Sequence, residues 1–197
     1  CFGSEINFSN NEIKGISNIT IDDILFANKL GYKIKLISEA YLSENQIYCV
    51  TEPKLVEKSN PLASVDGVLN AIKIETDQLK SLFLEGEGAG GMATASSVIS
   101  DLYEICSNTN ITSLGYNIHN LINYKKIKTL DIESSYYLRI NTKDTTGVLS
   151  KITGHFKDFN ISIERILQIP EKNKKESVPI VIFTHSIKKN KLLDAIK

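Results

Sequence analysis

Hydrophobic and polar residues alternate along much of the first half of the chain, a pattern typical of β-strands that bury one face. Residues 32–41 and 45–53 both alternate in this way and lie close enough to pair as a hairpin, which we expect Pro53 to end. Residues 68–75 and 80–86 are predicted to form two further strands, separated by a short polar turn and followed by a glycine-rich loop.

Two segments of the first half have helical rather than strand periodicity. Residues 21–30 are predicted to form a helix, because Thr20 can cap its start together with Asp23 and Gly31 can end it. A second helix follows the glycine-rich loop, with apolar residues spaced so that they share one face. These residues are Ala95, Val98, Ile99, Leu102, Ile105 and Cys106.

The second half changes character after a polar stretch at residues 108–133, which has little periodicity and is expected to connect two domains. Beyond it the pattern predicts strand, helix, strand, strand and helix, which is one strand short of the βαββαβ order of a ferredoxin-like domain. The predicted elements are residues 136–144, 146–160, 161–169, 178–186 and 190–197.

These patterns together predict an α+β protein with two domains. The first, residues 1–107, would hold the strands and helices described above, and the second, residues 134–197, would be the ferredoxin-like βαββα(β) domain with its last strand missing. Residues 108–133 are expected to be the linker.

Composition narrows the possible partners and compartments. The chain of 197 residues has 23 basic and 23 acidic side chains, so no strong field favours nucleic acid or an anionic membrane, and no apolar run approaches a membrane span. Cys1, Cys49 and Cys106 are odd in number and widely spaced, which indicates a reducing, cytoplasmic setting. Because Met92 is the single methionine, we expect the chain to be a piece of a longer protein.

The most suggestive motif is the stretch EGEGAGGMATAS, residues 85–96. Gly86, Gly88 and Gly91 have the G-x-G-x-x-G spacing with which dinucleotide-binding folds hold a pyrophosphate at a helix N-terminus. The sequence after the following helix, however, is no apolar strand and carries no acidic residue for a ribose. A flexible turn between strand and helix is therefore the interpretation favoured by the residues alone.

Titratable residues offer no catalytic or metal-binding group of their own. We interpret the lysines and aspartates of the first predicted helix and strand as solvated side chains or helix N-terminal acids, and the two loop glutamates as solvated. The histidines lack the spacing of metal ligands, so no metal site is predicted. The residues concerned are Asp22, Asp23, Lys33, Lys35, Glu85, Glu87, His119, His155 and His185.

NPLASVDGVLNAIKI followed by LFLEGEGAGGMATASSVISDL closely resembles the C-terminal half of the catalytic region of homoserine dehydrogenases, and the resemblance runs from Phe2 to about Leu102. It implies an oxidoreductase that interconverts L-homoserine and L-aspartate 4-semialdehyde with NAD or NADP in threonine, methionine and isoleucine biosynthesis. It also implies that residues 1–107 form a partial mixed-sheet substrate and dimerisation domain. The family's catalytic lysine and acidic residues match positions before Cys1, so we expect no catalytic residue here and an inactive chain.

In that family the glycine-rich loop lies beside the nicotinamide end of the cofactor. The resemblance therefore assigns cofactor contacts to Gly88, Ala89, Gly90, Gly91 and Thr94. Glycines let backbone N–H groups approach a ligand closely, and a helix N-terminus is electropositive. The alternative is that Thr94 only caps the helix while the glycines allow close packing of helix on sheet.

YYLRINTKDTTGVLSKITGHFKDFNISIERILQ resembles an ACT domain, a module that senses amino acids, over residues 136–196. The resemblance implies that an effector such as threonine is held between two copies by the turn at Asp144, Thr146, Gly147 and Val148. The family usually has proline before this glycine, where the chain has Thr146. Two alternatives stay open: a purely dimer-forming domain, and a stand-alone amino-acid-sensing module.

Overall fold

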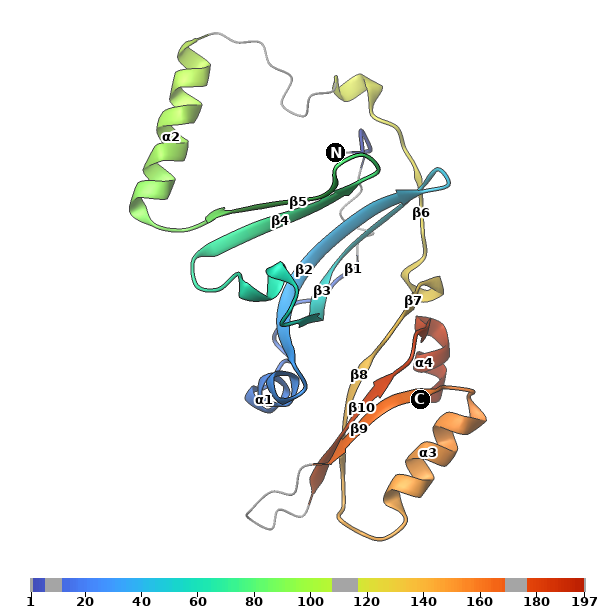
Figure 1. Ribbon diagram of the computed structural model, residues 1–197. Coiled ribbons are helices and arrows are strands. Elements are labelled where there is room, and N and C mark those ends of the chain that lie inside the picture. Colours follow the sequence, from blue (N-terminus) through green and yellow to red (C-terminus); the bar gives the residue numbers. More distant parts are fainter. Residues whose placement is uncertain (1, 6–11, 108–116, 169–176, 197) are drawn as a thin grey trace.

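The computed structural model describes residues 2–5, 12–107, 117–168 and 177–196. A long antiparallel hairpin of β2 (Tyr32–Ser43) and β3 (Gln46–Glu57) organises the first half (Figure 1). Two short strands, β1 (Glu12–Ile13) and β6 (Lys125–Lys126), pair with β3 in parallel. The first sheet is therefore mixed, as the sequence predicted.

Pro53 does not end its strand, contrary to expectation. It lies within β3 opposite Leu36, and the strand continues to Glu57. Along the chain β1 reaches β3 only at Val50 and Thr51, so among the described strands the stretch around Pro53 has β2 as its neighbour. A proline is tolerated at such an edge when its nitrogen, which cannot donate a hydrogen bond, faces away from the neighbouring strand.

Helix α1 (Ile21–Lys29) confirms the predicted helix and its capping. The Thr20 hydroxyl accepts a hydrogen bond from the Asp23 amide, and the Asp23 carboxylate accepts one from the Thr20 amide at 2.9 Å. This reciprocal pair satisfies two N–H groups that the first turn of a helix leaves without partners. Gly31 follows with φ of +88°, which ends the helix and turns the chain into β2.

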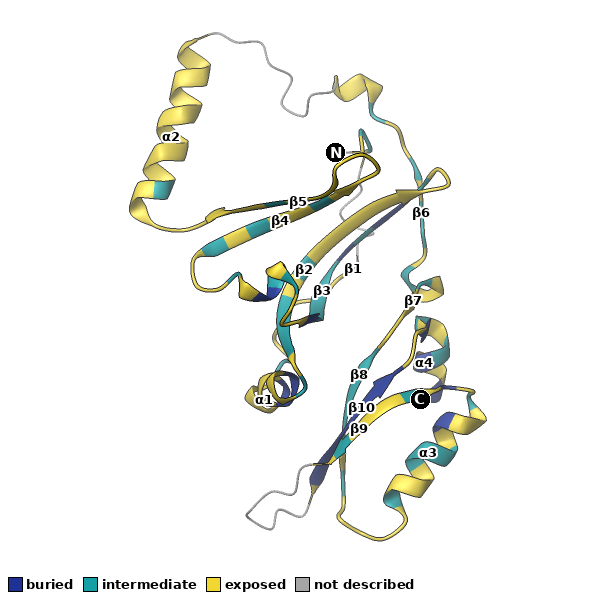
Figure 2. Cartoon of the chain, viewed as in Figure 1, coloured by how far each residue is buried: buried dark blue, intermediate teal, exposed yellow. Residues whose placement is uncertain are grey.

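The second hairpin, β4 (Leu69–Thr76) with β5 (Lys80–Glu87), is a separate two-stranded sheet. It follows a short 3₁₀ helix at Pro61–Ser64 and leads into α2 (Gly91–Cys106), which stands apart from both sheets in Figure 1. No residue of α2 is buried, and the predicted apolar face is open, with Ile99 66 % exposed. Figure 2 shows α2 as exposed except for one intermediate patch near its start.

Between the two halves, residues 117–134 contribute to both. Besides β6, which pairs with β3, this stretch holds two 3₁₀ turns, Ile118–Asn120 and Thr129–Asp131. It ends in β7 (Glu133–Ser134), which pairs with β11 (Ile187–Lys188) near the end of the chain. The segment expected to be a linker thus adds one strand to each half.

The second half has the predicted βαββα order. Its antiparallel sheet is arranged β8-β10-β9, with β10 in the centre. The elements are β8 (Tyr137–Thr142), α3 (Val148–Asp158), β9 (Ile163–Gln168), β10 (Val178–Thr184) and α4 (Lys189–Ala195).

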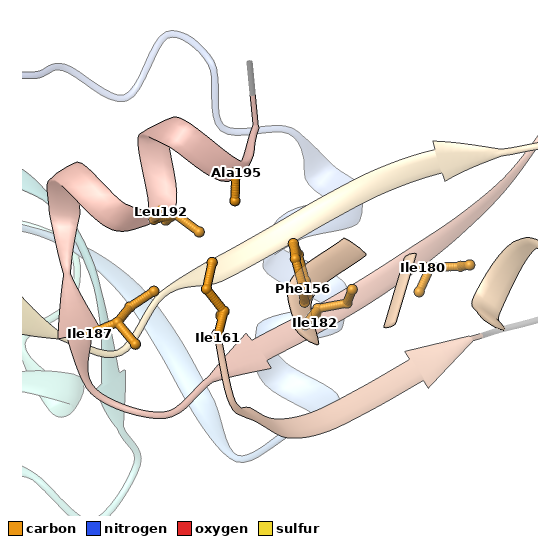
Figure 3. Close-up of a cluster of buried hydrophobic side chains, with 7 residues drawn as sticks. All are labelled: Phe156, Ile161, Ile180, Ile182, Ile187, Leu192 and Ala195. Atoms are coloured by element: carbon orange, nitrogen blue, oxygen red, sulfur yellow. The ribbon is translucent and has the colours of Figure 1, made fainter. Parts of the chain in front are cut away.

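Every residue of β10 is buried, because both faces of its sheet are covered. Ile180 and Ile182 lie against Phe156 of α3 and Leu192 of α4, in the cluster drawn in Figure 3. The opposite face is covered by the first half of the chain, through a cluster described below. A strand buried on both faces reads as a continuous apolar run rather than an alternation, which is what residues 178–183 show.

Candidate functional site

The glycine-rich loop connects the end of β5 to the start of α2. The Gly88 amide donates to the carbonyl of Val68 at 2.8 Å, which ties the loop to the residue before β4. A Cβ added to Gly88 would lie 1.4 Å from Nδ2 of Asn70, so the Asn70 side chain occupies the space that a larger residue would need. The close neighbour of Gly88 is therefore the Asn70 side chain rather than a helix, and a larger residue at position 88 would have to displace that side chain.

Gly90 is the N-cap of α2, and its backbone conformation favours glycine. Its φ of +122° is a conformation that residues with a Cβ rarely adopt. No side chain caps the helix, and the Thr94 amide donates to the Gly90 carbonyl at 3.0 Å as part of the first turn. The alternative in which Thr94 caps the helix is therefore wrong, because the helix begins three residues earlier.

The packing alternative for the glycines is not supported by the described residues either. A Cβ on Gly86, Gly90 or Gly91 would meet no atom within 4 Å. The loop presents open backbone together with the first turn of a helix, in which N–H groups lack partners within the helix. Such a surface suits an anionic or polar ligand.

Lys33 and Lys35 are not free solvated lysines, because both bind Asp66. Their Nζ atoms each lie 2.6 Å from a different oxygen of that carboxylate, and Lys35 also donates to the carbonyl of Val65. Hydrogen bonds from Lys33 and Lys35 lower the pKa of Asp66 to about 2. The alternation along this strand predicted that Leu36 is buried and Lys35 exposed to solvent. In the structure Leu36 is 51 % exposed, whereas the side chain of Lys35 is only 20 % exposed.

The predicted effector turn follows β8 and begins α3. Asp144, Thr146 and Gly147 are exposed, whereas Val148 packs against the cluster of Figure 3. Gly147 has φ of +87° and is the N-cap of α3 without a capping side chain. Asp144, Thr146 and Gly147 thus surround an uncapped helix start, while the Val148 side chain is turned to the core.

Asp23 has a second role, beyond the predicted capping of α1, that the sequence did not disclose. Rather than being solvated, it is 5 % exposed and joins α1 to the ACT-like sheet. Its carboxylate accepts hydrogen bonds from the Tyr137 hydroxyl at 2.9 Å and pairs with Arg139 Nε at 2.7 Å. Beside it, Phe26 packs against Val181 and Phe183, and Tyr32 stacks on Phe183 with ring centroids 5.7 Å apart.

Charge and burial shift the pKa values of this cluster in opposite directions. Burial alone would raise the pKa of Asp23, but hydrogen bonds from Thr20 and Tyr137 and the charge of Arg139 outweigh it and lower that pKa. Burial and the hydrogen bond to Asp23 raise the pKa of Tyr137. The pair therefore holds an ionised carboxylate against a neutral phenol between the two halves of the chain.

The other candidate side chains are dispersed. Glu85, Glu87 and His119 are exposed, the His155 ring lies 2.8 Å from the Ala195 carbonyl, and His185 is exposed at the end of β10. Cys106, expected on a buried helix face, is exposed because nothing described covers α2. Within the described ranges, no three His, Cys, Asp or Glu side chains gather as metal ligands would.

The described helices are also too short or too polar to cross a membrane. The fold and the loop together define an α+β protein in which a mixed-sheet region, followed by a second hairpin, a glycine-rich loop and a helix, is joined to a ferredoxin-like domain. The family model for homoserine dehydrogenase matches residues 1–103, and that for the ACT domain matches residues 136–197. The chain belongs to the homoserine dehydrogenase family and carries an ACT domain.

Individual relatives agree with this assignment. The chain is 36 % identical to homoserine dehydrogenase of Bacillus subtilis (strain 168), covering 93 % of this chain and 43 % of the relative. It is 34 % identical to that of Neisseria gonorrhoeae, covering 99 % and 46 %. The crystal structure of a homoserine dehydrogenase from Thiobacillus denitrificans matches with a TM-score of 0.81 and 31 % identity, covering 99 % and 45 %. The chain therefore spans about half the length of the relatives it matches.

Proposed function

We propose that the chain is part of an enzyme that interconverts L-homoserine and L-aspartate 4-semialdehyde with NAD or NADP, in the biosynthesis of threonine, methionine and isoleucine. The family match over residues 1–103 carries the proposal, since it includes the whole β4–β5 hairpin, the glycine loop and most of α2. It also disfavours a stand-alone sensor, because a sensor would not need this region. We place the enzyme in the cytoplasm as a homo-oligomer, most simply a dimer.

Within this enzyme the segment from Gly88 to Gly91, with Thr94, would border the cofactor. The residues fit that role, because the backbone at Gly90 and Gly91 is open and the first turn of α2 has no capping side chain. The cofactor would accept the hydride when homoserine is oxidised and donate it in the reverse direction, and the N–H groups at the start of α2 would hold a polar part of it in place. The described residues include no group that we assign to proton transfer.

The proposal is tested by comparing the full-length gene product with the 197-residue chain. We expect the full-length protein to oxidise homoserine, followed by the absorbance of the reduced nicotinamide, and the chain alone to show no turnover. The activity test uses the natural sequence with NAD and NADP in parallel. A substitution at Gly90 is avoided, because its φ of +122° would strain any residue with a Cβ. No homoserine-dependent reduction with either cofactor would contradict the proposed function.

We further propose residues 1–107 as the substrate and dimerisation domain, residues 134–197 as the ACT domain and residues 108–133 as their linker. The effector would be an amino acid, such as threonine, held at Asp144, Thr146, Gly147 and Val148. Because Val148 is turned to the core, it would contribute its backbone. The uncapped start of α3 suits the ligand's carboxylate.

Effector binding predicts a ligand-specific rise in the melting temperature of the chain. A ligand at about one hundred times its dissociation constant stabilises the folded state by about 2.7 kcal/mol. We expect one of threonine, methionine, isoleucine or homoserine to raise the melting temperature, and Gly147→Val to abolish that rise. Gly31→Val is the matched control, since Gly31 has φ of +88° and lies outside the ACT domain. A shift that survives in Gly147→Val would contradict this location of the site.

A further inference from the structure

The loop that precedes β4 is fastened to the first sheet by a two-lysine clamp, formed by Lys33, Lys35 and Asp66. The lysines are two residues apart on β2 and therefore on the same face of the strand. Each binds its own oxygen of the Asp66 carboxylate at 2.6 Å, and Lys35 also binds the Val65 carbonyl. A carboxylate held by two cations at separate oxygens is fixed in orientation as well as in position.

The same loop contacts the glycine-rich loop through Val68, and the start of β4 contacts it through Asn70. The Val68 carbonyl, two residues after Asp66, accepts the hydrogen bond from the Gly88 amide at 2.8 Å. Asn70 then places its side chain against Gly88. A path of contacts therefore runs from β2 through Asp66 and Val68 to the start of the glycine-rich loop.

This path matters because β4 and β5 form a sheet of their own. Among the described strands, they pair with each other and with no strand of the β2–β3 sheet. Their connection through the chain is the stretch from Lys58 to Val68, which contains the 3₁₀ helix Pro61–Ser64. The clamp joins the final part of that connection to β2 by side chains.

We propose that Asp66 is a positioning residue, which sets the place of the Gly88–Gly91 loop relative to the β2–β3 sheet through its two lysines. The inference rests on the proposed function, because the loop borders the cofactor only in that enzyme. Asp66 touches neither cofactor nor substrate in this account. It acts by holding Val68, whose carbonyl holds Gly88.

Glu75 offers a matched control for Asp66. It is an exposed carboxylate of β4 that binds Lys73 at 2.6 Å, with 71 % of its side chain exposed against 61 % for Asp66. Its partner is two residues away on the same strand, so the pair bridges nothing. Asp66→Asn and Glu75→Gln remove the same charge and differ in whether a bridge between two elements is lost.

The first measurement is amide hydrogen exchange in the full 197-residue chain, which requires no activity. We expect Asp66→Asn, and the pair Lys33→Met with Lys35→Met, to speed exchange at the Gly88 amide by about two- to fivefold. Glu75→Gln should leave it unchanged. Equal exchange in Asp66→Asn and Glu75→Gln would overturn the proposal, whatever the chain's function.

The second measurement is steady-state kinetics of the full-length gene product. We expect Asp66→Asn to raise the KM for the nicotinamide cofactor about threefold or more while kcat changes less, with partial rescue in Asp66→Glu. Kinetics of Asp66→Asn like those of Glu75→Gln would overturn the positioning role. If the natural full-length protein were inactive, the proposed function would be contradicted. The hydrogen-exchange measurement would still test the positioning role of Asp66, because it requires no activity.

Discussion

Asp23→Ala is expected to lower the free energy of unfolding by about 3 kcal/mol, the range for breaking a buried ion pair. The substitution leaves Arg139 without its anion and removes the acceptor of the Tyr137 hydroxyl. It also removes half of the capping arrangement with Thr20. Because Arg139 keeps 22 % of its side chain exposed, water can offset part of the loss, which places the effect at the lower end.

Asp22→Ala is the matched control, since Asp22 is the preceding, exposed acid of the same first turn. We expect it to change the stability by less than about 0.5 kcal/mol, as is usual for surface substitutions. Urea unfolding followed by tyrosine fluorescence and circular dichroism measures both. Similar losses in the two variants would show that Asp23 contributes only as a helix N-terminal charge.

The same cluster predicts a dependence on pH. The pKa of Asp23 is lowered in the folded protein, so its stabilising effect is complete above the ordinary aspartate pKa. The effect is lost as the pH falls through the lowered folded value. Stability of the natural chain should therefore decline on the acid side more steeply than that of Asp23→Asn.

Phe183→Ala is expected to cost about 3–5 kcal/mol, the range for truncating a buried aromatic side chain. Phe183 is 6 % exposed and contacts Tyr32 of the first sheet and Tyr137 of β8, with ring centroids at 5.7 Å and 5.6 Å. The substitution opens a cavity between the two halves rather than inside either one. We therefore expect calorimetry to show separate unfolding transitions for the two halves of Phe183→Ala. For the natural chain we expect a single transition.

Ile166→Ala provides the comparison for Phe183. Ile166 belongs to the same sheet, on the edge strand β9, and is 37 % exposed. Its truncation should cost less than about 1.5 kcal/mol and leave a single transition, because it does not face α1. A single transition in Phe183→Ala as well would mean that contacts other than this aromatic cluster join the two halves.

Local features were predictable from the sequence because their partners are near in the chain. The capping of α1 depends on Thr20 and Asp23, and the βαββα order follows from patterns within each element. Predictions that failed depended on distant neighbours, as two of them illustrate. Pro53 lies inside a strand because β1 does not extend beside it, and the face of α2 is open because no described element covers it.

The same distinction holds for the candidate sites. The glycines were recognisable as a loop before a helix. No pattern in the sequence, however, indicated that the Asn70 side chain lies against Gly88. Asp23 resembled any helix N-terminal acid, since Tyr137 and Arg139 lie more than a hundred residues further along the chain. The one signal in the sequence was the continuous apolar run of β10, which indicates that both faces of its sheet are covered. That run did not say that α1, with Asp23, covers the second face.

Helix α1 covers a face of the ACT sheet, and this limits how freely such a domain can be exchanged during evolution. A regulatory domain whose sheet is covered entirely by its own helices can be fused to another protein, or lost from it, without exposing apolar surface. Here the host supplies Phe26 and Asp23 to the module. In a family member that lost its ACT domain, the side of α1 that carries Phe26 and Asp23 would become exposed to solvent. We therefore expect gain or loss of the domain to be accompanied by substitutions at these two positions.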